Sequence, residues 1–323
     1  MTRRKGGSLL FSRKKRAGAG IFAGLALHGD SLRYVELDGS RGLRVVRQEF
    51  IPLSTGTVVK DSLKDTNALG VAFETLKDAL GKFTCPIVLG LPSRDVILRL
   101  VEYPKMPLED LKGALALEFQ KYFPYAWDDA ATDIAEVEVP SPDAAAKTTV
   151  LVATCELEKV KALLRVVSRL GMPLAALEPM NVAFFRAALG PDEPEGGSLM
   201  VQVEPEVTHI MMGYKDNGIL FRSAAVDLTL PEVRTTDEGL MPILRDVQNT
   251  LIFVGNQYRG IEVKNLVLGG TVGDNPRLKV FLEAATSLKV TVLDVWDIWK
   301  AASPLGSVPG YGVAFGLALR DLI

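Results

Sequence analysis

The chain offers few side chains that could perform acid–base or nucleophilic chemistry. Its 323 residues include two histidines, His28 and His209, and two cysteines, Cys85 and Cys155. These positions form no serine–histidine–acid or cysteine–histidine arrangement, and the cysteines lack the spacing of a metal site or disulfide framework. We therefore expect His28 in a turn, His209 as a packed or surface residue of a strand, and buried thiols in a reducing compartment.

A carboxylate and a glycine pair are the other chemical candidates. Glu118 lies between Leu115 and Phe119 in an amphipathic stretch beside Lys121, so an ion-paired or solvated role is expected rather than general-base catalysis. Gly269-Gly270 follows a short apolar run, and a strand-to-helix turn often requires glycine for packing alone.

Composition predicts a folded protein with a sizeable core, because 48% of the residues are hydrophobic and 24% are charged. No apolar stretch approaches the roughly 20 residues that span a bilayer. The basic start lacks the apolar core and cleavage site of a signal peptide, so we expect neither membrane crossing nor secretion.

Charge is distributed unevenly along the chain. Residues 3–16 carry seven lysines and arginines without an acid, so the formal net charge of −2 leaves the remainder at −9. We expect residues 1–19 to be a disordered basic arm, either simply solvated or held near an anionic membrane surface, where each basic residue contributes about 1 kcal/mol. No nucleic-acid partner is expected, because the body is acidic and has no basic stripe.

Hydrophobic alternation predicts one three-strand meander that occurs twice. Its predicted strands are Ile21–His28, Ser31–Leu37 and Gly42–Phe50, then Leu199–Glu204, Val207–Tyr214 and Gly218–Ala224. Helical periodicity follows each meander, at Pro107–Phe123, Glu156–Leu170 and Leu240–Tyr258.

The last third predicts a parallel βαβ unit. It consists of a strand at Asn265–Leu268, a helix capped by Asn275 with Pro276 at its first position, and a strand at Lys289–Asp294. Gly190–Gly197, rich in glycine, proline and acids, is the expected boundary between halves. A duplicated meander followed by helices and parallel strands is the pattern of actin, sugar-kinase and Hsp70 folds, although periodicity alone does not establish it.

Several segments together resemble one family. They are Gly24-Leu25 through Val35-Glu36-Leu37, Leu91–Ile97 followed by Tyr103-Pro104, Glu118–Tyr125 with its apolar-proline-aromatic step, Val150–Cys155, Leu170-Gly171 leading into Leu177-Glu178-Pro179, and Tyr311–Arg320. In this order, over about residues 20–323, they resemble the type IV pilus assembly protein PilM family and, more distantly, the cell-division protein FtsA.

The resemblance implies an α/β, actin-like ATPase fold with duplicated ribonuclease H-like halves and an FtsA-type inserted subdomain. The implied divisions are residues 20–85 with 156–190 for the first subdomain, 86–155 for the inserted one, and 198–323 for the second half.

In this superfamily two phosphate loops hold ATP, each with an acidic residue for the metal and glycines that let backbone amides approach phosphate. Where relatives carry Asp-x-Gly, this chain has Ala26-Leu27-His28 and Gln202-Val203-Glu204, and Ser223-Ala224-Ala225 replaces a later Gly-Gly. A vestigial site is left at Asp30, Ser31, Gly269 and Gly270. We expect neither a cofactor nor ATPase activity, the alternative being an active ATPase switched by Mg-ATP.

The resemblance implies a binding role at the cytoplasmic face of the inner membrane, within the pilus assembly complex. The implied partner is the N-terminal cytoplasmic peptide of a PilN-like membrane protein, held in a groove between the first and inserted subdomains. Residues expected near this groove are Leu91, Pro92, Leu115, Phe119, Tyr122 and Phe123. A split type II secretion cytoplasmic domain is the other alternative.

Overall fold

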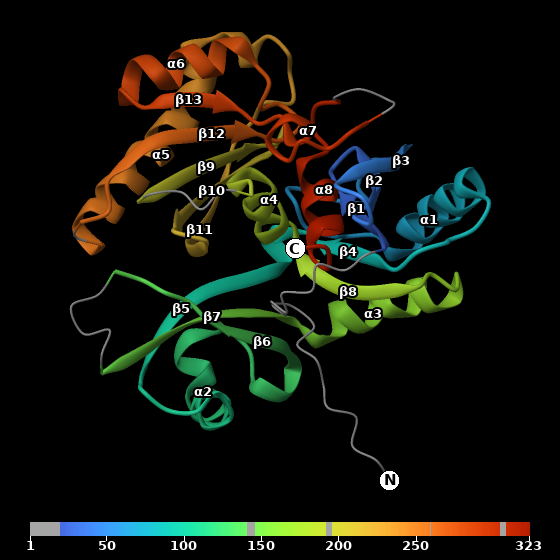
Figure 1. The fold of residues 1–323 in the computed structure, drawn as a ribbon, viewed down its shortest axis with the longest axis horizontal. Helices are drawn as coiled ribbons and strands as arrows, with labels where there is room; N and C mark the ends of the chain where they lie inside the picture. Colours follow the sequence, from blue (N-terminus) through green and yellow to red (C-terminus); the bar gives the residue numbers. More distant parts are fainter. Residues whose placement is uncertain (1–19, 141–145, 192–195, 259, 304–307) are drawn as a thin grey trace.

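Two five-stranded sheets and one three-stranded sheet organise the molecule (Figure 1). The computed structural model describes residues 20–140, 146–191, 196–258, 260–303 and 308–323. The expected basic arm and the centre of the expected boundary at Gly190–Gly197 lie outside these ranges. No helix within the described ranges is both long and apolar enough to cross a membrane.

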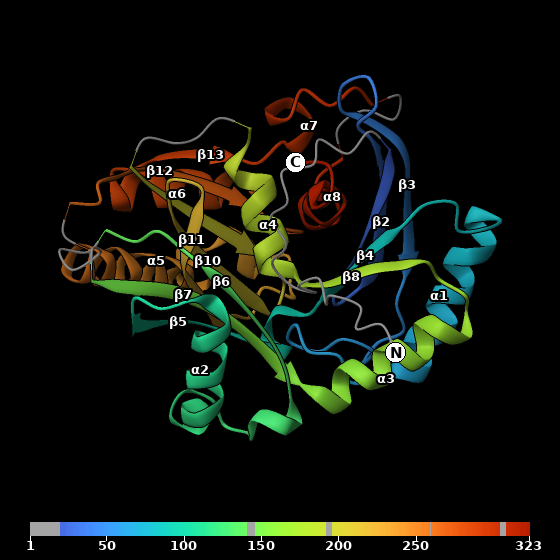
Figure 2. The same ribbon diagram turned by 60° about the horizontal axis from the view of Figure 1, so that its bottom comes forward.

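The first sheet has the order β3-β2-β1-β4-β8. Its members are β1 Ile21–Leu27, β2 Ser31–Asp38, β3 Arg44–Pro52, β4 Ile87–Leu91 and β8 Leu174–Pro179. The first three strands form the predicted antiparallel meander, whereas β4 and β8 run parallel to β1. Helices α1 Thr66–Leu80 and α3 Leu157–Arg169 cover one face, and α4 Met180–Leu189 and α8 Gly312–Leu319 lie on the other (Figure 2).

The second sheet repeats this arrangement in the order β11-β10-β9-β12-β13. Its members are β9 Gly197–Val203, β10 Val207–Tyr214, β11 Asn217–Ala225, β12 Val263–Gly269 and β13 Lys289–Val292, with α5 Asp237–Gln257 and α6 Pro276–Thr286 on its outer face. The predicted βαβ unit is confirmed, because β12 and β13 are parallel and α6 connects them. Asn275 caps α6 by accepting from the amides of Arg277 at 2.9 Å and Leu278 at 3.4 Å.

The inserted subdomain has its own sheet and its own core. Strands β5 Val96–Pro104, β7 Lys147–Glu156 and β6 Ala130–Glu136 pair antiparallel in that order, and α2 Leu108–Tyr122 packs on them. The predicted apolar stripe of α2 lies in this core, where the Phe119 ring centroid is 4.6 Å from that of Phe123 and 5.2 Å from that of Trp127. Glu118 forms the expected exposed ion pair with Lys121.

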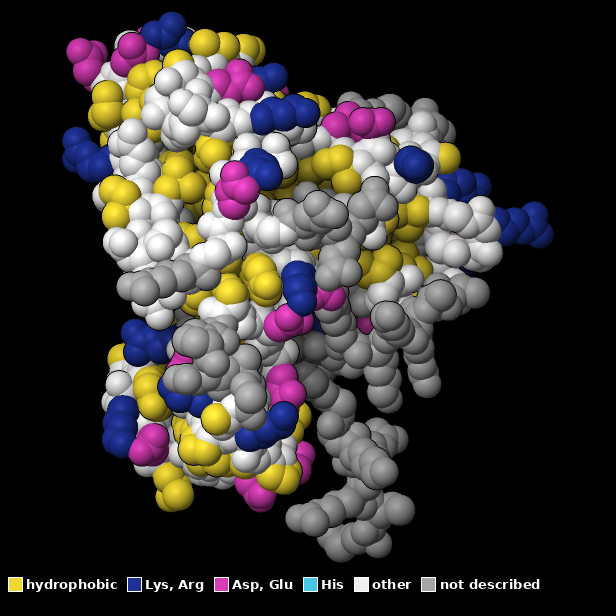
Figure 3. All heavy atoms as spheres, turned by 60° about the vertical axis from the view of Figure 1, so that its left-hand side comes forward, with side chains coloured by type: hydrophobic (Ala, Val, Ile, Leu, Met, Phe, Trp, Pro, Cys, Tyr) yellow, Lys and Arg dark blue, Asp and Glu magenta, His cyan; other side chains and the backbone are white. Residues whose placement is uncertain are grey.

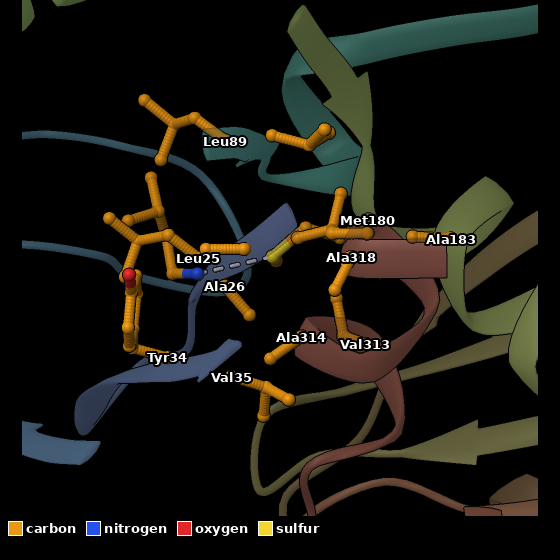
Figure 4. Close-up of a cluster of buried hydrophobic side chains, with 14 of the residues drawn as sticks. Leu25, Ala26, Tyr34, Val35, Leu89, Met180, Ala183, Val313, Ala314 and Ala318 are labelled. Atoms are coloured by element: carbon orange, nitrogen blue, oxygen red, sulfur yellow. Dashed lines mark hydrogen bonds between the residues drawn. The ribbon is translucent and has the colours of Figure 1, made fainter. Parts of the chain in front are cut away.

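Helices α4 and α8 pack against each other where the halves meet (Figure 4). Small residues permit the close approach of α8 to both β1 and α4, because a Cβ at Gly24 on β1 would lie 1.9 Å from the Ala314 carbonyl oxygen, and one at Gly316 would lie 1.9 Å from that of Ala183. Helix α8 falls within the range expected to form the second half, yet it packs on β1 of the first sheet. The core of the first half therefore extends into the second, which also has a core of its own between its sheet and α5 and α6.

Candidate functional site at the seam between the halves

Two tight hairpin turns, one from each meander, meet at the seam between the halves. In the first, the His28 amide donates to the Ser31 carbonyl at 2.9 Å, and in the second the Glu204 amide donates to the Val207 carbonyl at 2.9 Å. His28 and Glu204 are both buried, and His28 Nδ1 lies 3.5 Å from Glu204 Oε2. The corresponding turns of the duplicated fold thus touch through an imidazole and a carboxylate.

Glu204 is held as a buried carboxylate by three neighbours. Gln202 Nε2 donates to Glu204 Oε1 at 2.9 Å, and the Thr271 hydroxyl donates to Oε2. Burial opposes ionisation, but the charge of His28 and the hydrogen bonds from His28, Gln202 and Thr271 outweigh it and lower the pKa of Glu204 to about 2. A negative charge therefore occupies the space between the two turns.

A second imidazole–carboxylate pair crosses the same seam, but here the imidazole comes from the second half and the carboxylate from the first. His209 on β10 places Nε2 2.9 Å from Asp61 Oδ2, and its Nδ1 lies 2.7 Å from the Ser223 hydroxyl. Asp61 Oδ2 also accepts from the Ser93 amide at 2.8 Å. His209 and Asp61 are both buried, and His209 is a packed strand residue as one of the two expectations had it.

The loop that presents Asp61 has an unusual backbone. Lys60 and Asp61 both have positive φ, at 48° and 54°, in the left-handed region that side chains other than glycine rarely adopt. The Lys60 amide donates to Glu206 Oε2 in the second turn at 2.9 Å. Strained backbone persists where the surrounding contacts require it, and here those contacts reach across the seam.

The four residues of the expected vestigial ATP site lie next to the two turns that contribute His28 and Glu204. Asp30 is exposed and accepts from the Ser31 hydroxyl at 2.7 Å, while Ser31 is buried. Gly270 has φ of 98°, and a Cβ there would lie 2.4 Å from the Val203 carbonyl oxygen; a Cβ at Gly269 would meet the Phe184 ring at 2.9 Å. Both glycines are therefore required for packing, whatever else they do.

The residues expected near a peptide groove do not share one surface. Leu91 and Pro92 are buried where β4 ends, next to the core of the first half, whereas Leu115, Phe119 and Phe123 fill the core of the inserted subdomain. Tyr122 is the one member of this set with a partly exposed side chain. The stripe on α2 is an internal packing face, and Tyr122 lies at its edge, packed against the core with part of its side chain exposed.

A hollow of about 490 Å³ lies instead between the inserted sheet and the second half. Figure 3 looks onto this side, where hydrophobic side chains of both bodies reach the surface. Its apolar lining includes Leu98, Leu100, Leu151, Phe221, Phe253 and Tyr258. Sequence reasoning missed this site, although Ile252 and Phe253 lie off the buried stripe of α5 and are 63% and 43% exposed.

The described residues contain no cluster of histidine, cysteine and carboxylate side chains that could hold a metal ion. Sequence reasoning identified both turns and both histidines but not their partners. No period or spacing connects position 28 with 204, or 61 with 209. The available signal was limited to the rarity of histidine and the unusual residue types in the two turns.

Comparison with protein families matches residues 24–189 to the model described as type IV pilus assembly protein PilM. Comparison with curated proteins gives no match. Among solved structures, one described as a PilM–PilN type IV pilus biogenesis complex is 20% identical, covers 93% of this chain and 98% of its own, and has a TM-score of 0.78.

Two more distant structures share the architecture. A Bacteroides thetaiotaomicron protein described as having an actin-like ATPase fold is 12% identical over 85% of this chain and 91% of its own, with a TM-score of 0.51. The ethanolamine utilization protein EutJ from Carboxydothermus hydrogenoformans is 12% identical over 93% of this chain and 90% of its own, also with a TM-score of 0.51. These likenesses confirm the expected actin-like fold.

Proposed function

The chain belongs to the type IV pilus assembly protein PilM family, and from this premise we propose that it is a scaffold that captures the N-terminal cytoplasmic peptide of a PilN-like membrane protein. It works at the cytoplasmic face of the inner membrane, where residues 3–16 also favour an anionic lipid surface. The observation that carries the proposal is the likeness of 93% of the chain to a protein of a PilM–PilN complex.

The proposed scaffold functions without nucleotide and without catalysis. A triphosphate between the two hairpin turns would meet the ionised Glu204 carboxylate, which is buried and already satisfied by three partners. Pro205 removes one backbone donor from the second turn, and His28 and Glu204 bring the turns into direct contact. These features support a seam closed by the protein's own side chains, with neither ATP nor magnesium as a cofactor.

We place the peptide between the first and inserted subdomains, next to Tyr122. An extended segment would bind through its main chain with alternate side chains in pockets. The hollow between the inserted sheet and the second half, lined by Phe253 and Tyr258 among others, provides the comparison site for the test.

Calorimetric titration of the full chain tests both parts of the proposal. A synthetic peptide covering the cytoplasmic N-terminus of the PilN-like protein encoded nearby is expected to bind at micromolar affinity or better, while Mg-ATP gives no heat. A scrambled peptide serves as the control. Strong ATP binding without peptide binding would instead favour the nucleotide-switched ATPase over the scaffold.

Two substitutions locate the peptide. Tyr122→Ala is expected to weaken binding at least about tenfold, as for a central aromatic contact, while Phe253→Ala leaves it unchanged. Because both side chains are at least partly exposed, neither change should unfold the protein. The reverse result would move the peptide site to the hollow between the inserted sheet and the second half.

A further inference from the structure

Each of the two histidines in the chain lies beside a carboxylate of the other half. The first half contributes His28 and Asp61, and the second half contributes Glu204 and His209, so each half provides one imidazole and one carboxylate. All four residues are buried, with at most 8% of their surface exposed. The pairing is reciprocal, and separating the halves would break both pairs together.

These contacts are separate from the apolar connection between the halves. That connection runs through α4 and α8, whose small residues permit close packing. The two pairs belong to the hairpin turns, to strand β10 and to the loop with Lys60 and Asp61 in left-handed conformation. In actin-like folds the two halves can rotate about such a connection, so the turns are where a closed arrangement has to be held.

The seam is made largely of polar side chains, whereas the α4–α8 connection is mostly apolar apart from one buried ion-pair cluster, Glu178 with Arg186 and Arg320. Within the described ranges, His28 Nε2, Gln202 Oε1 and Thr208 Oγ1 are buried without a hydrogen-bond partner, and each such atom costs free energy that water would restore on opening. Buried ion pairs also stabilise less than apolar side chains of similar size. Because these polar pairs lie on hairpin turns, on β10 and on a loop, away from the α4–α8 packing, they suit a contact that opens and closes.

The charged groups around the two imidazoles come from four elements. They are Asp30 on the first turn, Lys60 and Asp61 on the loop, Arg94 on the short 3-10 helix Ser93–Asp95, and Glu204 and Glu206 on the second turn. The Arg94 guanidinium donates to the Lys60 carbonyl at 3.4 Å, and Glu206 accepts from the Lys60 amide. The groups in direct contact with each imidazole ring across the seam are carboxylates.

We propose that the pairs His28–Glu204 and Asp61–His209 form a reversible latch that holds the two halves closed without a bound ligand. The latch takes the place that bound nucleotide has in a nucleotide-switched actin-like protein. Closure of the halves then depends on whether another group binds these four side chains in place of their partners. This inference concerns the free protein and does not depend on peptide binding.

Fluorescence energy transfer between the halves tests the latch in the full chain. Val71 on α1 and Val280 on α6 are 64% and 59% exposed, so cysteines at these positions can carry a donor and an acceptor, while native Cys85 and Cys155 are buried. The parent protein is expected to show one closed population. Glu204→Gln or His209→Asn should increase the open fraction by about tenfold or more, because each leaves a buried partner uncompensated.

Two further variants decide the outcome. Glu118→Gln removes a carboxylate from an exposed ion pair away from the seam and should leave transfer unchanged. The double variant His28→Glu with Glu204→His exchanges the partners and should restore closure. Folded single variants that keep the parent transfer efficiency would overturn the latch. If the single variants unfold, the double variant decides. A double variant that is folded and closed supports the latch, and one that is unfolded or open overturns it.

Discussion

Glu204 remains ionised inside the protein because its neighbours replace the water that it has lost. The His28 ring, the Gln202 amide and the Thr271 hydroxyl all contact its carboxylate. Burial and compensation act in opposite directions on its pKa, and compensation is the larger effect. A single side chain thereby connects the first turn, the second turn and the segment after β12.

The stability of the protein should depend on this carboxylate in acid. The pKa of Glu204 is about 2 in the folded protein and ordinarily 4.5, so its ionisation adds stability above pH 4.5 that is lost as the pH falls toward 2. The shift corresponds to roughly 3 kcal/mol. Urea unfolding of the parent and Glu204→Gln proteins should therefore differ most near neutral pH and converge at low pH. A constant difference across this range would contradict the assignment.

The two cysteines should be inert in the folded protein. Burial raises the pKa of Cys155 to about 12 and that of Cys85 to about 11, so neither forms appreciable thiolate at pH 8. A thiol-reactive reagent is expected to modify neither residue in native buffer and both after unfolding in guanidinium. Rapid modification of a folded sample would show that one of these segments opens.

Glycine at two helix positions shows how neighbours decide the effect of a side chain. Gly316 in α8 lies against the backbone of α4, with the Ala183 carbonyl oxygen 1.9 Å from where a Cβ would stand. Gly113 in α2 has nothing within 4 Å of the same position. The same residue type is thus required for packing in one helix and is merely tolerated in the other.

Substitution of these glycines by alanine should change stability in opposite directions. Gly316→Ala is expected to lower the free energy of unfolding by about 3 kcal/mol or more, because α4 and α8 must separate. Gly113→Ala should raise it by up to about 1 kcal/mol, since alanine favours an exposed helix. Thermal and urea unfolding measure both changes. Equal effects would mean that α4 and α8 do not pack as described.

Most of the elements predicted from sequence have one buried face, although α1 has such a face as well and was not predicted. The meander strands, α2, α3, α5 and the capped start of α6 all agree with their predicted ranges to within a few residues. Helix α4 was not identified, because eight of its ten residues are buried and a helix that is apolar all round shows no periodicity. The placement of α8 on the first sheet was missed for the same reason, since seven of its eight residues are buried.

At the scale of the whole molecule, the described residues form three cores: one spans the first half and the neighbouring edge of the second, one lies within the second half, and one lies within the inserted subdomain. Buried residues of both halves, including Met211 and Trp296 with Leu25 and Phe184, form one cluster, while Phe119 and its neighbours form a separate cluster. The inserted subdomain can therefore respond to a local change that the two large sheets do not register.

Phe119→Ala should loosen the inserted subdomain alone. Truncating this buried ring is expected to cost about 3–5 kcal/mol locally, seen as faster amide hydrogen exchange within residues 97–152 and unchanged exchange in the two five-stranded sheets. Leu117→Ala on the same helix is the matched control, because Leu117 is 90% exposed. Faster exchange throughout the chain would show that the subdomain unfolds together with the halves.

The candidate site depends on this global arrangement, which is why sequence could not provide it. Periodicity predicts faces and turns within a few tens of residues, but His28 meets Glu204 and Asp61 meets His209 through the way the two halves pack. The residues predicted near the peptide groove do not lie together, because a local pattern does not show which neighbour a helix face contacts. A stripe such as Leu115 and Phe119 has the same spacing whether it faces a ligand or an internal core.

The scarcity of histidine makes the seam directly observable in solution. With two imidazoles in 323 residues, and both at the seam, the ring carbon–hydrogen signals in a histidine-labelled magnetic resonance spectrum arise from that location alone. Each ring contacts its own carboxylate, so the two signals report separately on the two ends of one interface. The protein thus carries its own pair of spectroscopic probes, and no foreign label is needed to follow how its halves move.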